Sequence, residues 1–471
     1  MRRYLSLIII ACCLPIIIMG VCDILPTFDD YTSLQSTWYI QIADPGYFFP
    51  DAVRRPFDFL FGCLLGYFPT FFPTLNHIVI ILGHSASAFL VYAICRRLKL
   101  DNLAANIATL YFFFSPATLG ATLACDGLNQ TYAQLWGLLA LWVYLGKHQR
   151  LWIACIIMAV LSKENGLAWA VVPPLVAYAF HLSGRRQTIR NTGIGLLIAF
   201  IYLITFFVIS HIGILHIEYA DEYSQSTLFS HLKDFIQLMA YTWVPLDYMS
   251  AVYQPARNWI IVVVTALMSV PFLFMLIRKW QLLKSRELPL LILCFFIVAS
   301  PHLVTLVSMM HNYAALSMAA FIVAFMVNET KEKTWFITTF SFYLAAALFT
   351  VLHHFQAARQ SGLLSQELAM QVISQADKPL ERVVCINIDD ETEPRYSNFC
   401  VRPVDAFAWG LSVRHHSHYT WKTDITNITL PQYNHQQIEM LADSALNNSF
   451  EAVWVVGHHP SKLLIIKNEQ K

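Results

Sequence analysis

The sequence predicts an α-helical polytopic membrane protein with about eleven transmembrane helices and a small mixed α/β domain after them. Composition is the first of three observations behind this prediction. Of 471 residues, 57% are hydrophobic and only 13% are charged, where ordinary soluble domains have about 25% charged residues. The mean hydropathy is +0.51. This composition excludes a soluble enzyme, a nucleic-acid-binding protein and a disordered scaffold, and the net charge of +1 gives no field that would attract nucleic acid.

The second observation is a series of apolar segments, each close to the ~20 residues that cross the hydrocarbon core. Pro173 and Pro174, with the polar turn Ser162–Asn165, divide what would otherwise be one long span into two. The eleven predicted spans are residues 4–22, 75–95, 103–120, 131–146, 150–162, 166–182, 192–215, 258–277, 288–309, 312–328 and 334–352.

The third observation is the placement of Lys and Arg, which gather in cytoplasmic loops of membrane proteins. With the N-terminus inside and the spans alternating, the inside segments before residue 353 hold sixteen Lys and Arg and the outside segments hold five (Arg54, Arg55, Lys163, Lys233 and Arg257). The carboxylates of this region gather outside. We therefore predict a multi-pass protein of a bacterial inner membrane with a cytoplasmic N-terminus. The first span, after Arg2 and Arg3, is interpreted as an uncleaved anchor.

Two long outer loops and a tail complete the predicted organisation. Residues 1–352 form the transmembrane domain, with outer loops 23–74 and 216–257. Loop 23–74 is rich in aromatic residues and suits the membrane interface. Loop 216–257 is interpreted as interfacial or re-entrant, although 235–250 would also pass as a poor span.

Residues 353–471 form the predicted extracytoplasmic, periplasmic domain. A helix over Gln356–Gln375 and strands over Arg382–Ile388 and Ala452–Val456 are expected there. Cys385 and Cys400 would be able to pair in an oxidising compartment. The tail histidines occur in pairs without the helical spacing and carboxylate of a zinc site, so no metal site is predicted.

The first outer loop holds the two candidate catalytic residues and two candidate phosphate ligands. Asp29 and Asp30 are adjacent, an arrangement that serves for a base or, alternatively, for a helix N-cap. Arg54 and Arg55 stand against the positive-inside trend, and their guanidinium groups match phosphate oxygens. Contact with bulk phospholipid is the alternative interpretation of this pair.

Further polar groups fall on the same predicted side. Lys163 and Glu164 lie in a short outer turn, where Lys163 would meet phosphate or the two would neutralise each other. Asp126, His311 and Tyr313 are candidate supporting residues at outer ends of spans. His84 and His302 lie within spans and are expected to hydrogen-bond a neighbouring helix.

The order of these features resembles the GT-C superfamily of membrane glycosyltransferases. The likeness rests on an anchor span, Asp29-Asp30, the step Arg55-Pro56, a His-containing second span and the Lys163-Glu164-x-Gly turn. It is strongest for the protein O-mannosyltransferase and aminoarabinose-transferase type. Two departures are Gly127-Leu128-Asn129-Gln130, where many relatives have charged residues, and His311-Asn312-Tyr313, where relatives often have Arg-Tyr.

The resemblance implies transfer of a hexose or pentose from a polyprenyl-phosphate donor to a protein hydroxyl, lipid or envelope glycan at the outer face. It implies Asp29 or Asp30 as base and Arg54, Arg55 and Lys163 at the donor phosphate, with inversion of the anomeric centre. No cofactor is expected, and the need for a divalent cation stays open. A transporter or flippase for a lipid-linked sugar, or a non-catalytic envelope scaffold, would share much of this layout. Transporters, however, usually have ionisable residues near the bilayer midplane.

Overall fold

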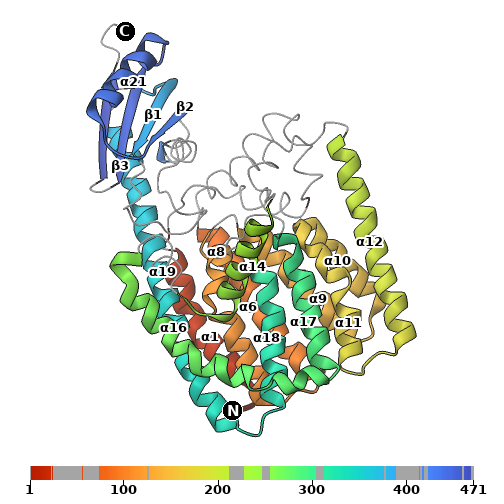
Figure 1. The fold of residues 1–471 in the computed structure, drawn as a ribbon. Helices are drawn as coiled ribbons and strands as arrows, with labels where there is room; N and C mark the ends of the chain where they lie inside the picture. Colours follow the sequence, from red (N-terminus) through yellow and green to blue (C-terminus); the bar gives the residue numbers. More distant parts are fainter. Residues whose placement is uncertain are drawn as a thin grey trace.

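The computed structural model describes most of the helical region and the core of the tail (Figure 1). The described residues are 2–22, 24, 56, 74–124, 127–211, 227–246, 255–303, 312–375, 378–388, 413, 416–417, 423–458 and 461–467. Statements about structure below concern these residues.

Helices occur in every one of the predicted spans. The α-helices of this region are α1 (Leu5–Cys22), α6 (Thr74–Arg97), α7 (Asn102–Phe113), α8 (Leu119–Thr122), α9 (Leu128–Leu145), α10 (Gln149–Ser162), α11 (Val172–Ala179), α12 (Arg185–His211), α14 (Leu228–Trp243), α16 (Pro255–Ile277), α17 (Glu287–Leu303), α18 (Tyr313–Asn328) and α19 (Lys333–Gln375). Short 3₁₀ helices are η1 (Arg2–Tyr4), η4 (Pro116–Thr118), η6 (Glu164–Ala170) and η7 (Trp280–Lys284). Within the described residues, five helices are long and apolar enough to cross a membrane, or six if α7 and its continuation count as one span.

Two predicted spans are interrupted, and proline explains both interruptions. The span predicted over 103–120 bends by 48° after α7, where Pro116 opens η4 and Ser115 caps it. The span predicted over 166–182 begins as η6 and becomes α-helical only at α11, whose first turn contains Pro173 and Pro174. Proline has no backbone N–H to continue a helix but is well suited to a first turn.

Helix α18 lies at the centre of the bundle, against α7, α17, α6 and α9 (Figure 1). Nearly all of its side chains are buried, and many are small, including Ala314, Ala315, Ala319 and Ala320. Small side chains let neighbouring backbones approach closely, which is how helices pack where lipid removes the hydrophobic driving force.

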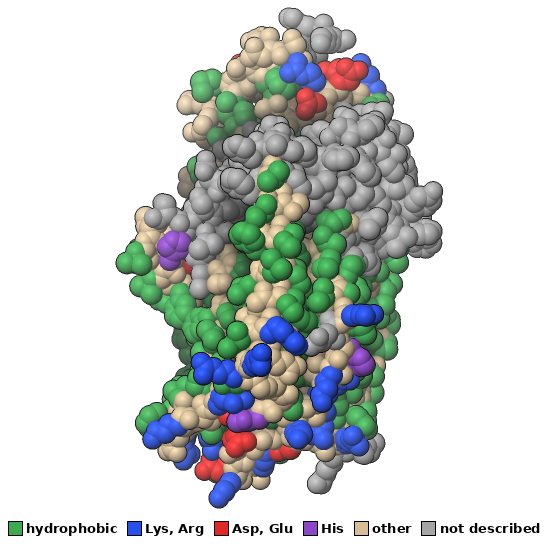
Figure 2. All heavy atoms as spheres, turned by 90° about the vertical axis from the view of Figure 1, so that its right-hand side faces the viewer, with side chains coloured by type: hydrophobic (Ala, Val, Ile, Leu, Met, Phe, Trp, Pro, Cys, Tyr) green, Lys and Arg blue, Asp and Glu red, His purple; other side chains and the backbone are tan. Residues whose placement is uncertain are grey.

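The helical bundle has a basic end and a sheet end. The basic end is where the loops hold Lys and Arg, and Figure 2 shows these side chains gathered below a broad hydrophobic surface. Ion pairs join the loops there: Lys333 Nζ lies 2.6 Å from Asp101 Oδ2, and Arg278 lies 3.8 Å from Glu332. The sheet end is opposite, where α19 leaves the bundle (Figure 1). The uneven placement of Lys and Arg matches the pattern from which the topology was predicted.

Helix α14 falls inside the predicted outer loop 216–257. It has 16 residues and begins with a capping box in which Thr227 and Ser230 satisfy each other's backbone groups. The face with Leu238, Tyr241 and Thr242 is buried, whereas Leu228 and Phe229 are exposed. Because α14 does not qualify as a spanning helix by length and composition, the interfacial or re-entrant interpretation stands as a prediction.

Helix α19 joins the bundle to the tail without interruption. Its 43 residues pass through the predicted boundary at 352/353. Phe336, Phe340 and Tyr343 belong to the core of the bundle, while Leu368 and Val372 belong to the core beside the sheet. The helix predicted over Gln356–Gln375 is therefore the second half of one long helix.

The tail contains a four-stranded mixed sheet in the order β2-β1-β3-β4. Its strands are β1 (Arg382–Ile388), β2 (Asp424–Leu430), β3 (Ala452–His458) and β4 (Ser461–Lys467). β1 pairs in parallel with β2 and β3, and β3 pairs antiparallel with β4. The predicted strands are confirmed as β1 and β3, whose apolar runs are typical of strands buried on both faces.

Helices cover both faces of this sheet. Val383, Cys385 and Trp454 face α19, while alternate residues such as Val384 and Val453 face α21 (His435–Asn447). The small mixed α/β domain is thus present. Cys385 is buried. Cys400 lies outside the described residues, so the disulfide stays a prediction.

Candidate functional site

The predicted Lys-Glu turn forms the junction between α10 and η6 at the sheet end. Lys163 has extended backbone angles, φ −161° and ψ 148°, which end α10 and start η6 at Glu164. Gly166 makes this junction compact because a Cβ there would lie 2.3 Å from the carbonyl oxygen of Ala159. Only glycine permits such an approach of one backbone to another.

Lys163 is buried and is held by the helix that it faces. Its side chain is 9% exposed, and Nζ donates a hydrogen bond of 3.2 Å to Oδ1 of Asn129 at the start of α9. Asn129 belongs to the stretch Gly127–Gln130, which departs from the charged pattern of the superfamily that the sequence resembles. The amide oxygen fixes the ammonium group in place. Glu164, the next residue, is half-buried.

Three further amide side chains lie along the same two elements. Gln130 and Gln134 are one helical turn apart on α9 and are 0% and 2% exposed, and Asn165 follows Glu164 in η6. Both polar atoms of each glutamine, and Oδ1 of Asn165, are buried without a hydrogen-bond partner in the described part of the chain. One turn below Gln134, Gly137 receives the ring of Trp169 from η6. We refer to Lys163, Asn129, Gln130, Gln134 and Asn165 as the amide cluster.

The start of α18 holds a second polar network. Thr242 at the end of α14 donates to Oδ1 of Asn312 at 2.9 Å, while Nδ2 of Asn312 is buried without a partner among the described residues. The predicted supporting residue Tyr313 is fully buried and pairs with Nδ1 of His84.

His84 is held between two helices. Its Nε2 lies 3.1 Å from the carbonyl oxygen of Phe113, which accepts only from a protonated nitrogen. Nδ1 of the neutral ring therefore accepts from the Tyr313 hydroxyl. This arrangement confirms that His84 hydrogen-bonds to neighbouring helices, and it places Tyr313 as a link between α18 and α6.

Asp234 on α14 is a buried carboxylate that was not a candidate in the sequence. Its side chain is 2% exposed, and Oδ2 has no hydrogen-bond partner in the described residues. Burial raises its pKa, with the positive charges of Lys233 and His231 acting the other way. The apolar periodicity of α14 is clear in the sequence, but a carboxylate on its buried face is unexpected, and only the packing of α14 reveals the burial of Asp234.

Most of the other predicted site residues lie outside the described residues. These are Asp29, Asp30, Arg54, Arg55, Asp126 and His311. Their assignments stay predictions. In the described part of the chain, no group of three or more His, Cys, Asp or Glu side chains could hold a metal ion.

The fold and the polar groups at its sheet end define a polytopic helical membrane protein. More particularly, the chain belongs to the family described as "Predicted membrane protein (DUF2079)", which it matches over residues 60–362, well over half of its length. No curated protein sequence matches this chain.

Two solved structures are similar to this chain in layout. One is the archaeal oligosaccharyltransferase AglB from Archaeoglobus fulgidus in complex with an inhibitory peptide and a dolichol-phosphate, with 12% identity and a TM-score of 0.43. The other is the Archaeoglobus fulgidus oligosaccharyltransferase in complex with Zn and sulfate, with 14% identity and a TM-score of 0.42.

Each match covers 92% of this chain, which spans 66% and 64% of the lengths of those proteins. With TM-scores under 0.5, these matches show nothing about activity, donor or acceptor.

Proposed function

We propose that this protein is a glycosyltransferase that moves a sugar from a polyprenyl-phosphate donor to an acceptor at the sheet end of the bundle, the outer face of the membrane. The acceptor is a protein hydroxyl, a lipid or an envelope glycan. The proposal extends the GT-C resemblance of the sequence, and the amide cluster supports it most directly.

The amide cluster is a set of hydrogen-bonding groups that the protein leaves unsatisfied in an apolar bundle. A buried amide without a partner costs about 1–3 kcal/mol. Gln130 and Gln134 together present two donor groups and two acceptor oxygens without partners in the described residues. The hydroxyl groups of a sugar both donate and accept hydrogen bonds, so they are suited to satisfy such side chains.

Lys163 supplies the complementary charge. When a sugar leaves its lipid carrier, negative charge develops on the phosphate oxygen, and a cation in a low-dielectric site stabilises it. The bond from Nζ to Asn129 fixes the ammonium group at the start of α9, the helix that also carries the two glutamines. Lys163 therefore serves the departing phosphate, with Arg54 and Arg55 as further phosphate ligands.

The reaction also needs a base to take a proton from the acceptor. We assign this role to Asp29 or Asp30. The acceptor oxygen then attacks the anomeric carbon as the phosphate leaves from the opposite side, so one displacement inverts the configuration. No nucleotide site is required because the lipid phosphate is already a leaving group.

The test is transfer of labelled hexose from synthetic polyprenyl-monophosphate hexoses to an envelope fraction by the purified full-length protein. Removing the base by Asp29→Asn with Asp30→Asn is expected to lower the rate about 10²–10⁴-fold. Asp51→Asn is the matched control, a carboxylate of the same loop with no assigned role. Transfer at the wild-type rate by the double variant would contradict the base assignment, and Asp234→Asn then tests the buried carboxylate of α14.

The same purified protein also distinguishes transfer of the sugar from the alternative function, transport of the lipid-linked sugar across the membrane. Reconstituted vesicles that carry the labelled donor on one side report its movement across the membrane. Movement of the donor without any transfer of label would identify a flippase and overturn the proposal.

A further inference from the structure

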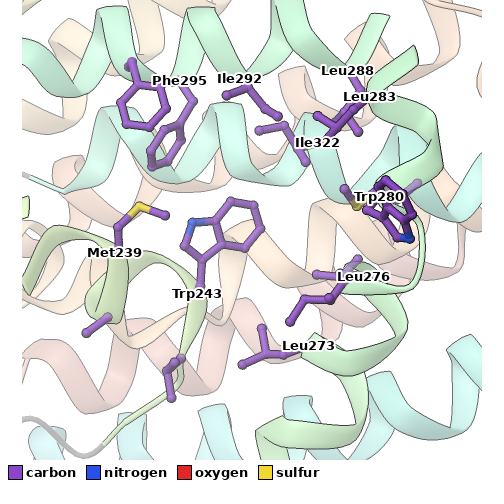
Figure 3. Close-up of a pocket in the computed structure, with 15 residues that line it drawn as sticks. Met239, Trp243, Leu273, Leu276, Trp280, Leu283, Leu288, Ile292, Phe295 and Ile322 are labelled. Carbon is purple, nitrogen blue, oxygen red and sulfur yellow. The ribbon is translucent and has the colours of Figure 1, made fainter. Parts of the chain in front are cut away.

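A cavity of about 660 Å³ lies between α14, α16, η7, α17 and α18, and all fifteen side chains that line it are apolar (Figure 3). Its size is within the range of about 300–1,000 Å³ typical of ligand pockets. Trp243 and Met239 of α14 lie on one side of it, and Ile292 and Phe295 of α17 lie opposite (Figure 3).

The cavity has a deep floor and an open rim. Leu276, Leu288 and Phe295 are 5% exposed or less and belong to the core of the bundle. At the rim, Ile277 and Trp280 are 69% and 63% exposed. A flat, lipid-facing surface would have no such floor. The exposed rim therefore leaves an opening on the side of the bundle through which one hydrocarbon chain would enter the cavity.

The open rim of the cavity belongs to the basic end, whereas Trp243 follows Thr242, which bonds to Asn312 at the start of α18. Ile277 is the last residue of α16, Trp280 and Leu283 come from η7, and Met326 is near the end of α18. The amide cluster lies on other elements, α9 and the junction of α10 with η6, toward the sheet end. Tyr313 and Met326 are thirteen residues apart on α18, which corresponds to about 20 Å along the helix axis.

Unpaired positive charge flanks the rim. Lys279 directly precedes Trp280, and Lys284 directly follows Leu283. Neither lysine has an ion pair within the described residues. Nearby cations are engaged: Arg278 pairs with Glu332, and Arg286 stacks on the ring of Tyr178. An exposed indole such as Trp280 also prefers the headgroup level of a bilayer.

We propose that this cavity binds one acyl chain of an anionic glycerophospholipid from the leaflet at the basic end, with its phosphate headgroup on Lys279 and Lys284. The apolar lining selects a hydrocarbon chain, and the two free ammonium groups select negative charge. This site is separate from the sugar-transfer site proposed above and does not depend on that function.

The experiment measures lipids retained by the full-length protein. Protein reconstituted in nanodiscs of equal phosphatidylglycerol and phosphatidylcholine is released into detergent, and bound lipids are counted by native mass spectrometry. One retained phosphatidylglycerol is expected, with little phosphatidylcholine. Lys279→Gln with Lys284→Gln should lower the preference about 25-fold, since each surface cation contributes roughly a fivefold factor.

Two further variants complete the test. Ile277→Trp, which narrows the rim without entering the core, should reduce retention of both lipids. Lys147→Gln with Lys331→Gln removes two cations of the same end away from the cavity and should retain the wild-type preference. Equal retention of the two lipids by the wild-type protein would overturn the proposal. Displacement of phosphatidylglycerol by polyprenyl phosphate at equal concentration would also overturn it, since the cavity would then hold the donor's tail.

Discussion

The two ends of the helical bundle use polar residues in different ways. At the basic end, charges pair with one another and tie loops together, as Lys333 and Asp101 do at 2.6 Å. At the sheet end, Asn129 holds one buried lysine, and amide atoms of Gln130, Gln134 and Asn165 have no partner in the described residues. Paired charges stabilise the protein itself, whereas unsatisfied amides are costly until something else binds them. The difference separates the end that holds the bundle together from the end where we expect chemistry.

The largest effect is expected from the glycine that makes the sheet end compact. In Gly166→Val, the added Cβ would lie 2.3 Å from the Ala159 oxygen and 2.4 Å from its carbonyl carbon. Because backbone atoms of α10 cannot easily move, stability should fall by about 3 kcal/mol. Thermal unfolding in detergent measures this loss. Gly193→Val, in α12 with open space around the Cβ position, is the control, and equal stability of the two variants would disprove the close approach.

Removal of the buried charge should come next. Lys163→Met keeps the length of the side chain and removes its donors, so affinity for polyprenyl phosphate should fall about 10–100-fold, as for a charged hydrogen bond of ~1.5–3 kcal/mol. Lys163→Arg should restore part of that affinity. Binding of labelled polyprenyl phosphate is the measurement. An affinity unchanged in Lys163→Met would remove Lys163 from the phosphate site.

Gln134 of the amide cluster allows stability and sugar transfer to be compared in a single variant. Gln134→Leu replaces a buried amide without partners by an apolar side chain of similar size. Stability of the ligand-free protein should rise by about 1 kcal/mol, while sugar transfer should fall. Opposite signs in the two assays distinguish a binding residue from a structural one. A loss of stability would mean that the amide has a structural role.

The smallest effect is expected at the basic end. Asp101 caps α7 through the N–H of Ala104 and pairs with Lys333, and both charged side chains are partly exposed. Asp101→Asn keeps the cap and removes the charge, so stability should fall by less than about 1 kcal/mol and transfer should not change. The loss should shrink further in high salt. A reduced transfer rate would show that the two ends are coupled.

Much of the helical framework followed from the sequence because apolar segments and proline are local signals. The interruption at Pro116 and the 3₁₀ start at Glu164 were hidden because a hydropathy pattern does not show how a helix bends. Strands β1 and β3 were predictable from their apolar runs. β2 was not, because Asp424–Leu430 is half polar and gains its strand character from pairing with β1.

The candidate site was predicted less completely. Lys163 stood out as a cation against the positive-inside trend. Gln130 was noted only as part of the departure Gly127–Gln130. Gln134, inside the predicted span 131–146, did not stand out, since a glutamine in a span looks the same whether it meets a partner helix or nothing. Only packing reveals that their amides are buried and unsatisfied.

Because α19 is continuous, its length sets both the distance of the sheet domain from the bundle and the rotation of that domain about the helix axis. At about 1.5 Å per residue, its 43 residues form a helix roughly 65 Å long. Its first part packs among aromatic residues of the bundle, and its last part packs against the sheet. Each residue inserted into α19 would rotate the sheet domain by about 100° around the helix axis. The length of α19 therefore determines the direction in which the sheet domain faces a partner.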